Sequence, residues 1–165
     1  LSLRTRLAEQ LKERKPRIIR GNASEIMALA GYSSVTKGPE STSSSADALQ
    51  AARELALHTG AAVLVTGRTD YSTDGRQVTS TENGHAMMSR VTGVGCSMGA
   101  LAAACAAVSS SPLQAAVSTA VLMGIAGEMA FEQSPAPGSF AVSLLDSLYS
   151  LSPEEVARRA RILPL

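Results

Sequence analysis

The sequence lacks tryptophan, and aromatic residues make up only 3% of its 165 positions. So few aromatic rings argue against the stacking platforms on which proteins bind single-stranded nucleic acid. Net charge is also nearly absent, because 15 basic and 14 acidic side chains leave a formal charge of +1 at pH 7. This balance provides no basic field for nucleic acid or for an anionic membrane surface. We therefore expect neither nucleic acid nor a membrane as a partner.

Cysteine is scarce as well, and the apolar runs are short. Two cysteines without the spacing of a disulfide framework are typical of a reducing compartment. The longest apolar tract, Met98–Val108, is too short to span a membrane, and the charged, amphipathic start does not have the pattern of a signal peptide. We expect a cytoplasmic protein. Because the chain begins with Leu1 rather than Met, we also expect it to be part of a longer polypeptide.

The hydrophobic pattern predicts one domain, residues 1–165, in which helices and strands alternate. Helices are expected to end before residue 16 and to cover about 26–30, 46–58, 98–108, 113–131 and 139–148, with a charged last helix near 154–159. Strands are expected at 17–19, 61–65, 71–73 and 76–78. The run at 61–65 is apolar throughout, which is typical of a parallel strand covered on both faces.

A glycine pair, Gly93 and Gly95, comes directly before a run of small and apolar residues. This pattern predicts a glycine turn that opens a buried helix. The first N–H groups of such a helix have no partner within it, and the helix dipole adds about half a positive charge, so phosphate is a natural ligand. Cys96 lies in the same first turn and could serve there as a base. The alternative is structural: the glycines would only allow close packing, and Cys96, like Cys105, would be a core residue.

Asn22 and Glu25 stand three residues apart after a predicted strand and before a predicted helix. This spacing is typical of a capping box, in which each side chain accepts a hydrogen bond from the other residue's backbone N–H. An amide and a carboxylate at the carboxyl end of a strand can also hold the waters of Mg²⁺. The spacing alone favours the cap.

Polar residues follow two of the predicted strands. Arg20 comes directly after the strand at 17–19, and the segment Thr66–Asp70 follows the strand at 61–65. Open α/β sheets bind ligands at the carboxyl ends of their strands, and Arg20 is placed there to meet a phosphate. The alternative is an ordinary strand exit with surface charges.

Three further segments carry local signals. Asp74–Gly75 predicts a β-hairpin, and the Ser/Thr-rich stretch Tyr32–Ser45 predicts a mobile surface loop. His85 is expected at the surface. Met87 and Met88 are expected in the strand before the glycine turn, as core residues or as the lining of an apolar pocket.

Five short segments occur in a fixed order between about residues 15 and 148: Arg20–Ile26, Val65–Gly67, Thr73–Gly75, Gly93–Cys96 and Pro137–Phe140. Together they resemble the hydroxyethylthiazole kinase family of the ribokinase-like superfamily. The combination is far more specific than any one segment. The resemblance implies an α/β protein with a three-layer αβα ribokinase-like fold and a mostly parallel central sheet. This chain would be its C-terminal, nucleotide-binding portion, with the N-terminal part missing.

The resemblance also implies an activity: phosphorylation of the primary hydroxyl of 4-methyl-5-(2-hydroxyethyl)thiazole with ATP and Mg²⁺, by a homotrimer. ATP would contact Arg20, Thr66, Gly93, Val94 and Gly95; the thiazole would contact Gly93 and Cys96; and Mg²⁺ would be held, through water, by Asn22 and Glu25. Cys96 would take the place of the aspartate base found in most of the superfamily. For Asn22 and Glu25 the resemblance favours the metal role, and one pair can also form the cap.

Two features depart from the family pattern. Val94 replaces the usual threonine of the glycine turn and so lacks its hydroxyl. The family's N-terminal part, which supplies much of the thiazole pocket, would precede Leu1. Three alternatives stay open: another small-alcohol or vitamin-precursor kinase of the superfamily, acyl transfer by Cys96 with His85 or His58 as base, and a non-catalytic nucleotide-binding module.

Overall fold

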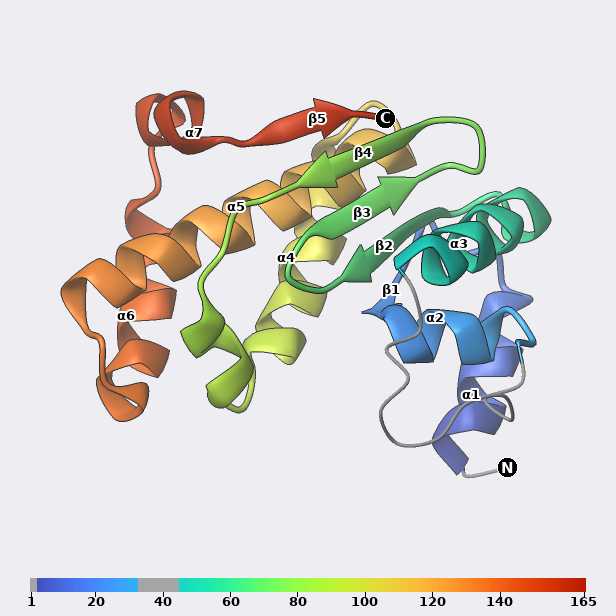
Figure 1. Ribbon diagram of the computed structural model, residues 1–165, viewed down its shortest axis with the longest axis horizontal. Helices are drawn as coiled ribbons and strands as arrows, with labels where there is room; N and C mark the ends of the chain where they lie inside the picture. The colour runs from blue at the N-terminus through green and yellow to red at the C-terminus, as the bar shows by residue number, and fades with distance from the viewer. Residues whose placement is uncertain (1–2, 33–44) are drawn as a thin grey trace.

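The computed structural model describes residues 3–32 and 45–165. The short apolar runs form a five-stranded sheet in which the strands follow the order β1-β2-β3-β4-β5 (Figure 1). The strands are β1 (Ile18–Asn22), β2 (Ala62–Thr66), β3 (Asp70–Thr73), β4 (Val78–Thr81) and β5 (Ile162–Pro164). The order in space is therefore the order in the chain.

The direction of the strands corrects one expectation. β1 and β2 are parallel, whereas β3 pairs antiparallel with β2, β4 with β3, and β5 with β4. The α/β class is confirmed, but a mostly parallel sheet is wrong for the strands that the structure describes. Parallel neighbours need a crossover of a dozen or more residues, while a short turn can join only antiparallel strands. The turns after β2 and β3, residues 67–69 and 74–77, are short, and the hairpin at Asp74–Gly75 is confirmed.

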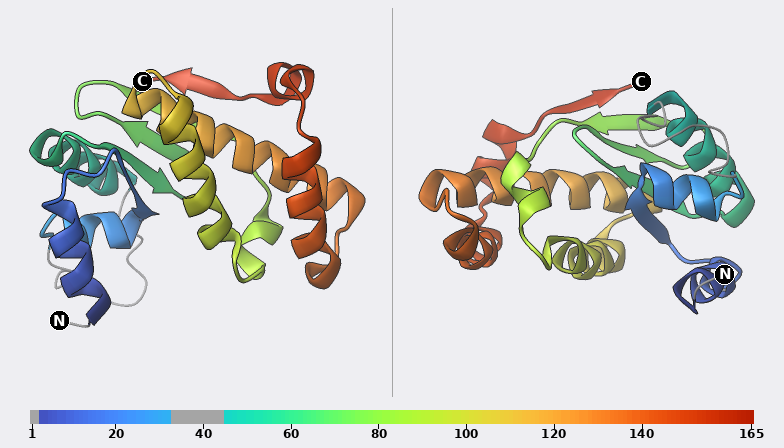
Figure 2. Two further views of the ribbon diagram at one scale, coloured as in Figure 1. Left: turned by 180° about the vertical axis from the view of Figure 1, so that it is seen from behind. Right: turned by 60° about the horizontal axis from the view of Figure 1, so that its bottom comes forward.

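Helices cover both faces of the sheet. They are α1 (Leu3–Lys12), α2 (Ala23–Leu29), α3 (Ser45–Thr59), α4 (Val94–Val108), α5 (Pro112–Gln133), α6 (Pro137–Ser150) and α7 (Pro153–Arg159). On β2, Val63 and Val65 belong to a core cluster with α2 and α3, and Ala62 and Leu64 to a second cluster with α4, α5 and α6. Seen from behind, α4 and α5 lie across the back of the sheet (Figure 2). The result is the three-layer arrangement that the resemblance implied.

α5 is the central helix of the second layer. The Ser111 hydroxyl caps it by accepting the N–H of Gln114 at 3.2 Å, with Pro112 in the first turn. Within the described residues, α5 is the one helix long and apolar enough to cross a membrane by length and composition, and 61% of its most apolar window is buried inside the protein. α5 packs against the sheet, where it contacts β1, β2, β3 and β4.

Two expectations for the segment before α4 are wrong. Met87 and Met88 lie in η1 (Ala86–Arg90), a 3₁₀ helix, instead of in a strand. His85 is half-buried: its Nδ1 accepts the N–H of Met87 at 3.1 Å, and its ring stacks on Phe131 with 3.6 Å between centroids. The physical reason is that η1 packs on α5 and α6, not beside a strand. Local hydrogen bonds therefore take the place of a sheet ladder.

α4 follows the glycine turn as predicted, with Gly95 and Cys96 in its first turn. The expectation that it is a buried helix is right for one face only. Its buried residues are Met98, Ala102 and Cys105. Toward its end, by contrast, Val108 is 86% exposed. The prediction that Cys105 is a core residue is confirmed.

The remaining elements lie close to their predicted positions, with α1, α2, α3, α6 and α7 each found where a helix was expected. The predicted loop Tyr32–Ser45 falls mostly outside the described residues, which omit 33–44. β5 was not predicted. Its three residues pair with the outer edge of β4, with Ile162 opposite Thr81.

Candidate active site

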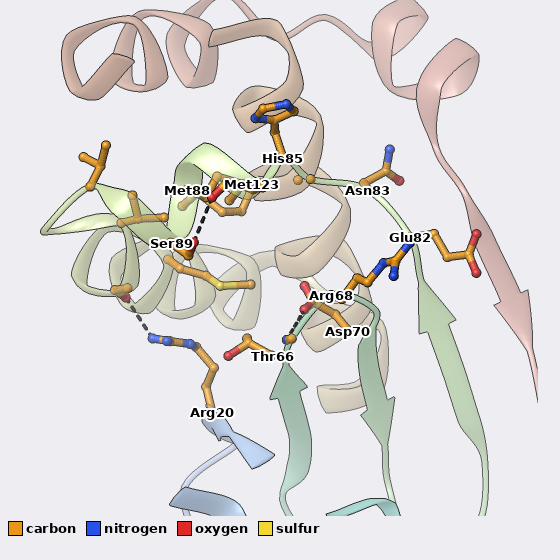
Figure 3. Close-up of a pocket in the computed structure, with 18 residues that line it drawn as sticks. Arg20, Thr66, Arg68, Asp70, Glu82, Asn83, His85, Met88, Ser89 and Met123 are labelled. Carbon is orange, nitrogen blue, oxygen red and sulfur yellow. Dashed lines mark hydrogen bonds between the residues drawn. The ribbon is translucent and has the colours of Figure 1, made fainter. Parts of the chain in front are cut away.

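A cavity of about 870 Å³ lies where β1 and β2 end, beside η1 and the start of α4 (Figure 3). Arg20, Thr66 and Asp70 form part of its polar wall, and the apolar part includes Met98 and Met123. Its position at the carboxyl ends of the parallel strand pair is where α/β sheets bind ligands. Its volume is within the range of small-molecule sites.

Arg20 joins the sheet to α4. Its Nη1 donates to the carbonyl oxygen of Gly95 at 2.8 Å, although 75 positions separate the two residues in the chain. Its Nε is buried and has no hydrogen-bond partner in the described part of the chain. A buried N–H without an acceptor is unfavourable, and an oxygen atom of a ligand would supply one. The guanidinium is thus held in place and keeps donors for an anion.

The turn between β2 and β3 forms the next part of the wall. The hydroxyl of Thr66 donates to the carbonyl oxygen of Gly21 at 3.3 Å, and the N–H of Gly67 donates to Oδ1 of Asp70 at 2.9 Å. Burial raises the pKa of Asp70 to about 6, although the Gly67 hydrogen bond and the positive charge of Arg20 act in the opposite direction. A carboxyl group with a perturbed pKa in a cavity is typical of a functional site.

The glycine turn exposes the start of α4. Gly93, at the N-cap position, has a left-handed φ of 100°, and no side chain caps the helix. Its carbonyl oxygen accepts the N–H of Ser97 at 2.9 Å. The earlier N–H groups of the helix therefore have no intrahelical partner. Cys96 is exposed in this first turn.

Of the six residues predicted to bind ATP or the thiazole, four line this cavity, whereas Asn22 and Glu25, which the resemblance assigns to Mg²⁺, do not. The predicted residues that line the cavity are Arg20, Thr66, Val94 and Gly95. Gly93 and Cys96 do not line it, but each is bonded to a residue that does. Residues from β1, β2 and α4 thus converge, as the resemblance implied.

Known proteins match this chain along nearly its whole length. The sequence profile of the hydroxyethylthiazole kinase family matches residues 1–154. The chain belongs to the hydroxyethylthiazole kinase family. It is 92% identical over 165 residues to the hydroxyethylthiazole kinase of Akkermansia muciniphila, covering 100% of this chain and 61% of that protein. Its identity to the hydroxyethylthiazole kinase of Granulibacter bethesdensis is 50%, covering 99% of this chain and 60% of that protein.

A solved member of the family has the same fold. The structure of the hydroxyethylthiazole kinase protein from Pyrococcus horikoshii superposes with a TM-score of 0.86 at 36% identity, covering 98% of this chain and 60% of that chain. The chain thus spans about three fifths of the length of the relatives it matches. The resemblance to the family that the five segments indicated is confirmed.

The residues that the family resemblance assigns to Mg²⁺, Asn22 and Glu25, form a complete capping box on α2. Oδ1 of Asn22 accepts the N–H of Glu25 at 3.0 Å, and Oε2 of Glu25 accepts the N–H of Asn22 at 2.8 Å. The structural interpretation is confirmed. Oε1 of Glu25 makes no hydrogen bond to another described residue. In the described part of the chain, no three His, Cys, Asp or Glu side chains gather as a metal site.

α5 fixes the segment that follows β4. A methyl group at Gly124 would lie 2.5 Å from Cβ of Asn83, so only glycine lets this segment pass so close to the helix. Oε1 of Glu128 accepts the N–H of Gly84 at 2.8 Å, and Oδ1 of Asn83 accepts the N–H of Arg161 at 2.8 Å. These contacts were not predicted from the sequence. A glycine inside a helix gives no sequence signal of what packs against it.

The alternative of acyl transfer gains no support from the geometry. Across the described residues, Cys96 makes no hydrogen bond to a histidine. Nδ1 of His85 is used by the N–H of Met87, and His58 lies exposed in the last turn of α3. Neither imidazole is held as a base for the thiol.

Proposed function

We propose that the protein phosphorylates the primary hydroxyl of 4-methyl-5-(2-hydroxyethyl)thiazole with ATP and Mg²⁺, a reaction of thiamine biosynthesis and salvage. Membership of the family supports this proposal. The observation that carries it is the convergence of Arg20, Thr66 and Gly95 on one cavity. These residues come from β1, β2 and α4, and only the fold brings them together.

In this proposal the phosphates of the nucleotide lie between Arg20 and the start of α4. The guanidinium offers a delocalised charge and a fork of donors, and the uncapped N–H groups of α4 offer an anion site. Phosphoryl transfer depends mainly on positioning and on neutralising charge. Val94 contributes shape to this site but no hydroxyl group.

We assign the chemical step to Cys96, with Gly93 beside the thiazole. The Cys96 sulfur orients the accepting alcohol and, as the thiolate, takes its proton and becomes the thiol as the alcohol oxygen bonds to the γ-phosphorus. The bond from that phosphorus to its bridging oxygen breaks, and ADP leaves with the bridging oxygen. The position of Cys96 supports this role, since it follows Gly95 and is exposed.

Asn22 and Glu25 fit a Mg²⁺ ion that is bound through water. Mg²⁺ prefers oxygen ligands, keeps several waters and is often bound by one or two carboxylates together with substrate phosphates. Once bound, the ion would neutralise phosphate charge. Glu25 offers its Oε1 while Oε2 stays in the cap, so the side chain is already oriented.

We further propose that the protein works in the cytoplasm as a homotrimer, as the family resemblance implies. Val142, Leu145 and Tyr149 are exposed at helical spacing on α6 and give an apolar surface that is compatible with association.

A kinase assay on the native protein tests the proposed function. The native protein is incubated with Mg²⁺-ATP and the hydroxyethylthiazole, and mass spectrometry follows the gain of one phosphoryl group. The matched control substrate is 4-methyl-5-ethylthiazole, which lacks only the hydroxyl. We expect a phosphorylated product from the first compound alone. Faster turnover of another vitamin-precursor alcohol in a substrate panel would refute the proposed substrate.

The role of Cys96 has its own test. Removing a positioned base typically lowers the rate about 10²–10⁴-fold, so we expect Cys96→Ala to lower kcat by at least about tenfold with a smaller change in the KM for ATP. Cys96→Asp should retain activity, because a carboxylate can also accept the proton. The matched control is Cys105→Ala in the buried face of the same helix. Unchanged turnover in Cys96→Ala would contradict the assignment.

A further inference from the structure

We propose that Asp70 is a positioning residue of the nucleotide site. Its side-chain oxygen holds the turn between β2 and β3, residues 67–69, in the shape that presents Thr66 and Gly67 to the cavity. The inference rests on the proposed function, because it assumes that this cavity binds a nucleotide. It adds a residue to which the family resemblance gave no role.

The first support is the hydrogen bond that closes the turn. Oδ1 of Asp70 accepts the N–H of Gly67 at 2.9 Å, across three positions of the chain (Figure 3). Asp70 is also the first residue of β3, where it lies opposite Thr81 of β4. One end of the bond is therefore anchored in the sheet and the other holds the backbone next to Thr66. A side chain that bonds a nearby backbone N–H is a standard way to fix a turn.

The second support is the place of the carboxyl group in the cavity. Asp70, Thr66 and Gly67 all line it. The Thr66 hydroxyl donates to Gly21 at the end of β1, so the same turn is tied to the neighbouring strand. A shift of the backbone in this turn would therefore move both Thr66 and Gly67 in the cavity wall.

The third support is that the carboxyl group is kept there although its ionised form is unfavourable. Burial raises its pKa to about 6, and the positive charge of Arg20 offsets only part of that effect. The other charged or titratable side chains that line the cavity are Arg68, Glu82 and His85. A half-buried acid whose ionised form is unfavourable near neutral pH is typical of a functional site.

The test compares two substitutions in the native protein. Asp70→Ala removes the acceptor, and we expect the KM for ATP to rise by about tenfold or more, with kcat changed less than threefold, because the Gly67 N–H loses its partner and the turn that presents Thr66 is no longer held. Asp70→Asn keeps a side-chain oxygen, and we expect its KM to stay within about threefold of the wild-type value. A rise in Asp70→Asn equal to that in Asp70→Ala would overturn the proposal and assign the role to the charge.

The chain offers a matched control in its next turn. Oδ1 of Asp74 accepts the N–H groups of Arg76 and Gln77, so Asp74→Ala opens a turn of the same kind at the far end of the β3–β4 hairpin. Asp74 does not line the cavity. We expect this variant to leave the KM for ATP unchanged. A rise in the KM for ATP in Asp74→Ala equal to that in Asp70→Ala would show that Asp70 only stabilises the sheet in general.

A measurement without nucleotide separates this inference from the proposed function. Amide hydrogen exchange of Gly67 should become at least about tenfold faster in Asp70→Ala and stay slow in Asp70→Asn, because only the alanine leaves the N–H unbonded. If Gly67 exchange behaves so but no variant or wild-type protein binds ATP, the proposed function fails while the role of Asp70 in the turn stands. Unchanged exchange in Asp70→Ala would overturn the inference itself.

Discussion

Arg20 is the residue through which the sheet and α4 meet at the cavity, by its hydrogen bond to Gly95. If it binds phosphate, Arg20→Ala should raise the KM for ATP by about tenfold or more, because a charge-assisted pair is lost. The KM of Arg20→Lys should lie between those of the wild type and Arg20→Ala, since lysine keeps the positive charge but lacks the forked set of N–H donors. Steady-state kinetics measure both. Arg76→Ala, an exposed arginine on the β3–β4 turn, is the control. Unaltered ATP kinetics in Arg20→Ala would remove Arg20 from the site.

Asp70 makes the stability of the protein depend on pH. Its pKa is raised by burial from 3.8 to about 6, so the folded protein holds this proton more tightly than the unfolded chain does. The protonated group therefore contributes stability that is fully present below about pH 4 and is lost as the pH rises through 6. Asp70→Asn stays neutral and should be more stable than the wild type at pH 7.5 by about 1–3 kcal/mol.

Urea unfolding at two pH values measures this difference. The gain of Asp70→Asn should shrink toward zero near pH 4, where the wild-type carboxyl group is also neutral. Asp74 provides the comparison, because its pKa is lowered: the effect of burial is outweighed by the N–H groups of Gln77, Arg76 and Asp74 itself. Asp74→Asn should lose stability at pH 7.5. A gain of Asp70→Asn that is the same at both pH values would show that ionisation is not its cause.

At the scale of an element, the capping box on α2 allows the two proposed roles of Glu25, capping the helix and holding Mg²⁺, to be tested separately. Glu25→Gln keeps an oxygen for the N–H of Asn22, and glutamine is accepted at this position of a capping box. We expect the unfolding free energy to stay within about 0.5 kcal/mol of the wild type, while the Mg²⁺ concentration for half-maximal activity rises several-fold. Loss of heat stability with an unchanged Mg²⁺ response would leave the cap as the only role.

The contact between α5 and the segment after β4 depends on the absence of a side chain. In Gly124→Ala the new methyl group would lie 2.5 Å from Cβ and 2.7 Å from backbone atoms of Asn83, so backbone has to shift. Overpacking of this kind costs about 1–3 kcal/mol, and the wall of the cavity should move with it. Denaturant unfolding measures the loss. Gly138→Ala, which has open space around its Cβ position, should cost far less.

The elements that sequence reasoning predicted are those whose signal is local. The apolar run of β2, the turn at Asp74–Gly75 and the capping box of Asn22 and Glu25 each depend on residues that are neighbours in the chain. η1 and β5 depend on partners far away. Met87 and Met88 carry the apolarity of a strand, and only their packing on α5 and α6 decides for a 3₁₀ helix. β5 needs the free edge of β4, about eighty positions earlier in the sequence.

For the molecule as a whole, the sequence predicted which segments meet at the site but not the relative directions of the strands in the sheet. The order of the five family segments gave the layers and placed Arg20, Thr66 and Gly95 at one site, and the structure brings them together there. β2, β3 and β4 are antiparallel because short turns join them, and the ligand-binding segments do not indicate the direction of these strands. The supporting residues Asn83, Gly124 and Glu128 stayed unpredicted as a group, because their contacts join segments about forty positions apart.

The two cysteines differ in a way that is useful at the bench. Cys96 is exposed at the start of α4, whereas Cys105, nine positions along the same helix, is 6% exposed in the core. A maleimide dye should therefore attach at one place under native conditions and leave the other thiol untouched. Cys96 does not line the cavity itself, but it follows Gly95, which does. Cys96 thus offers an attachment point for a fluorescent reporter without an added cysteine.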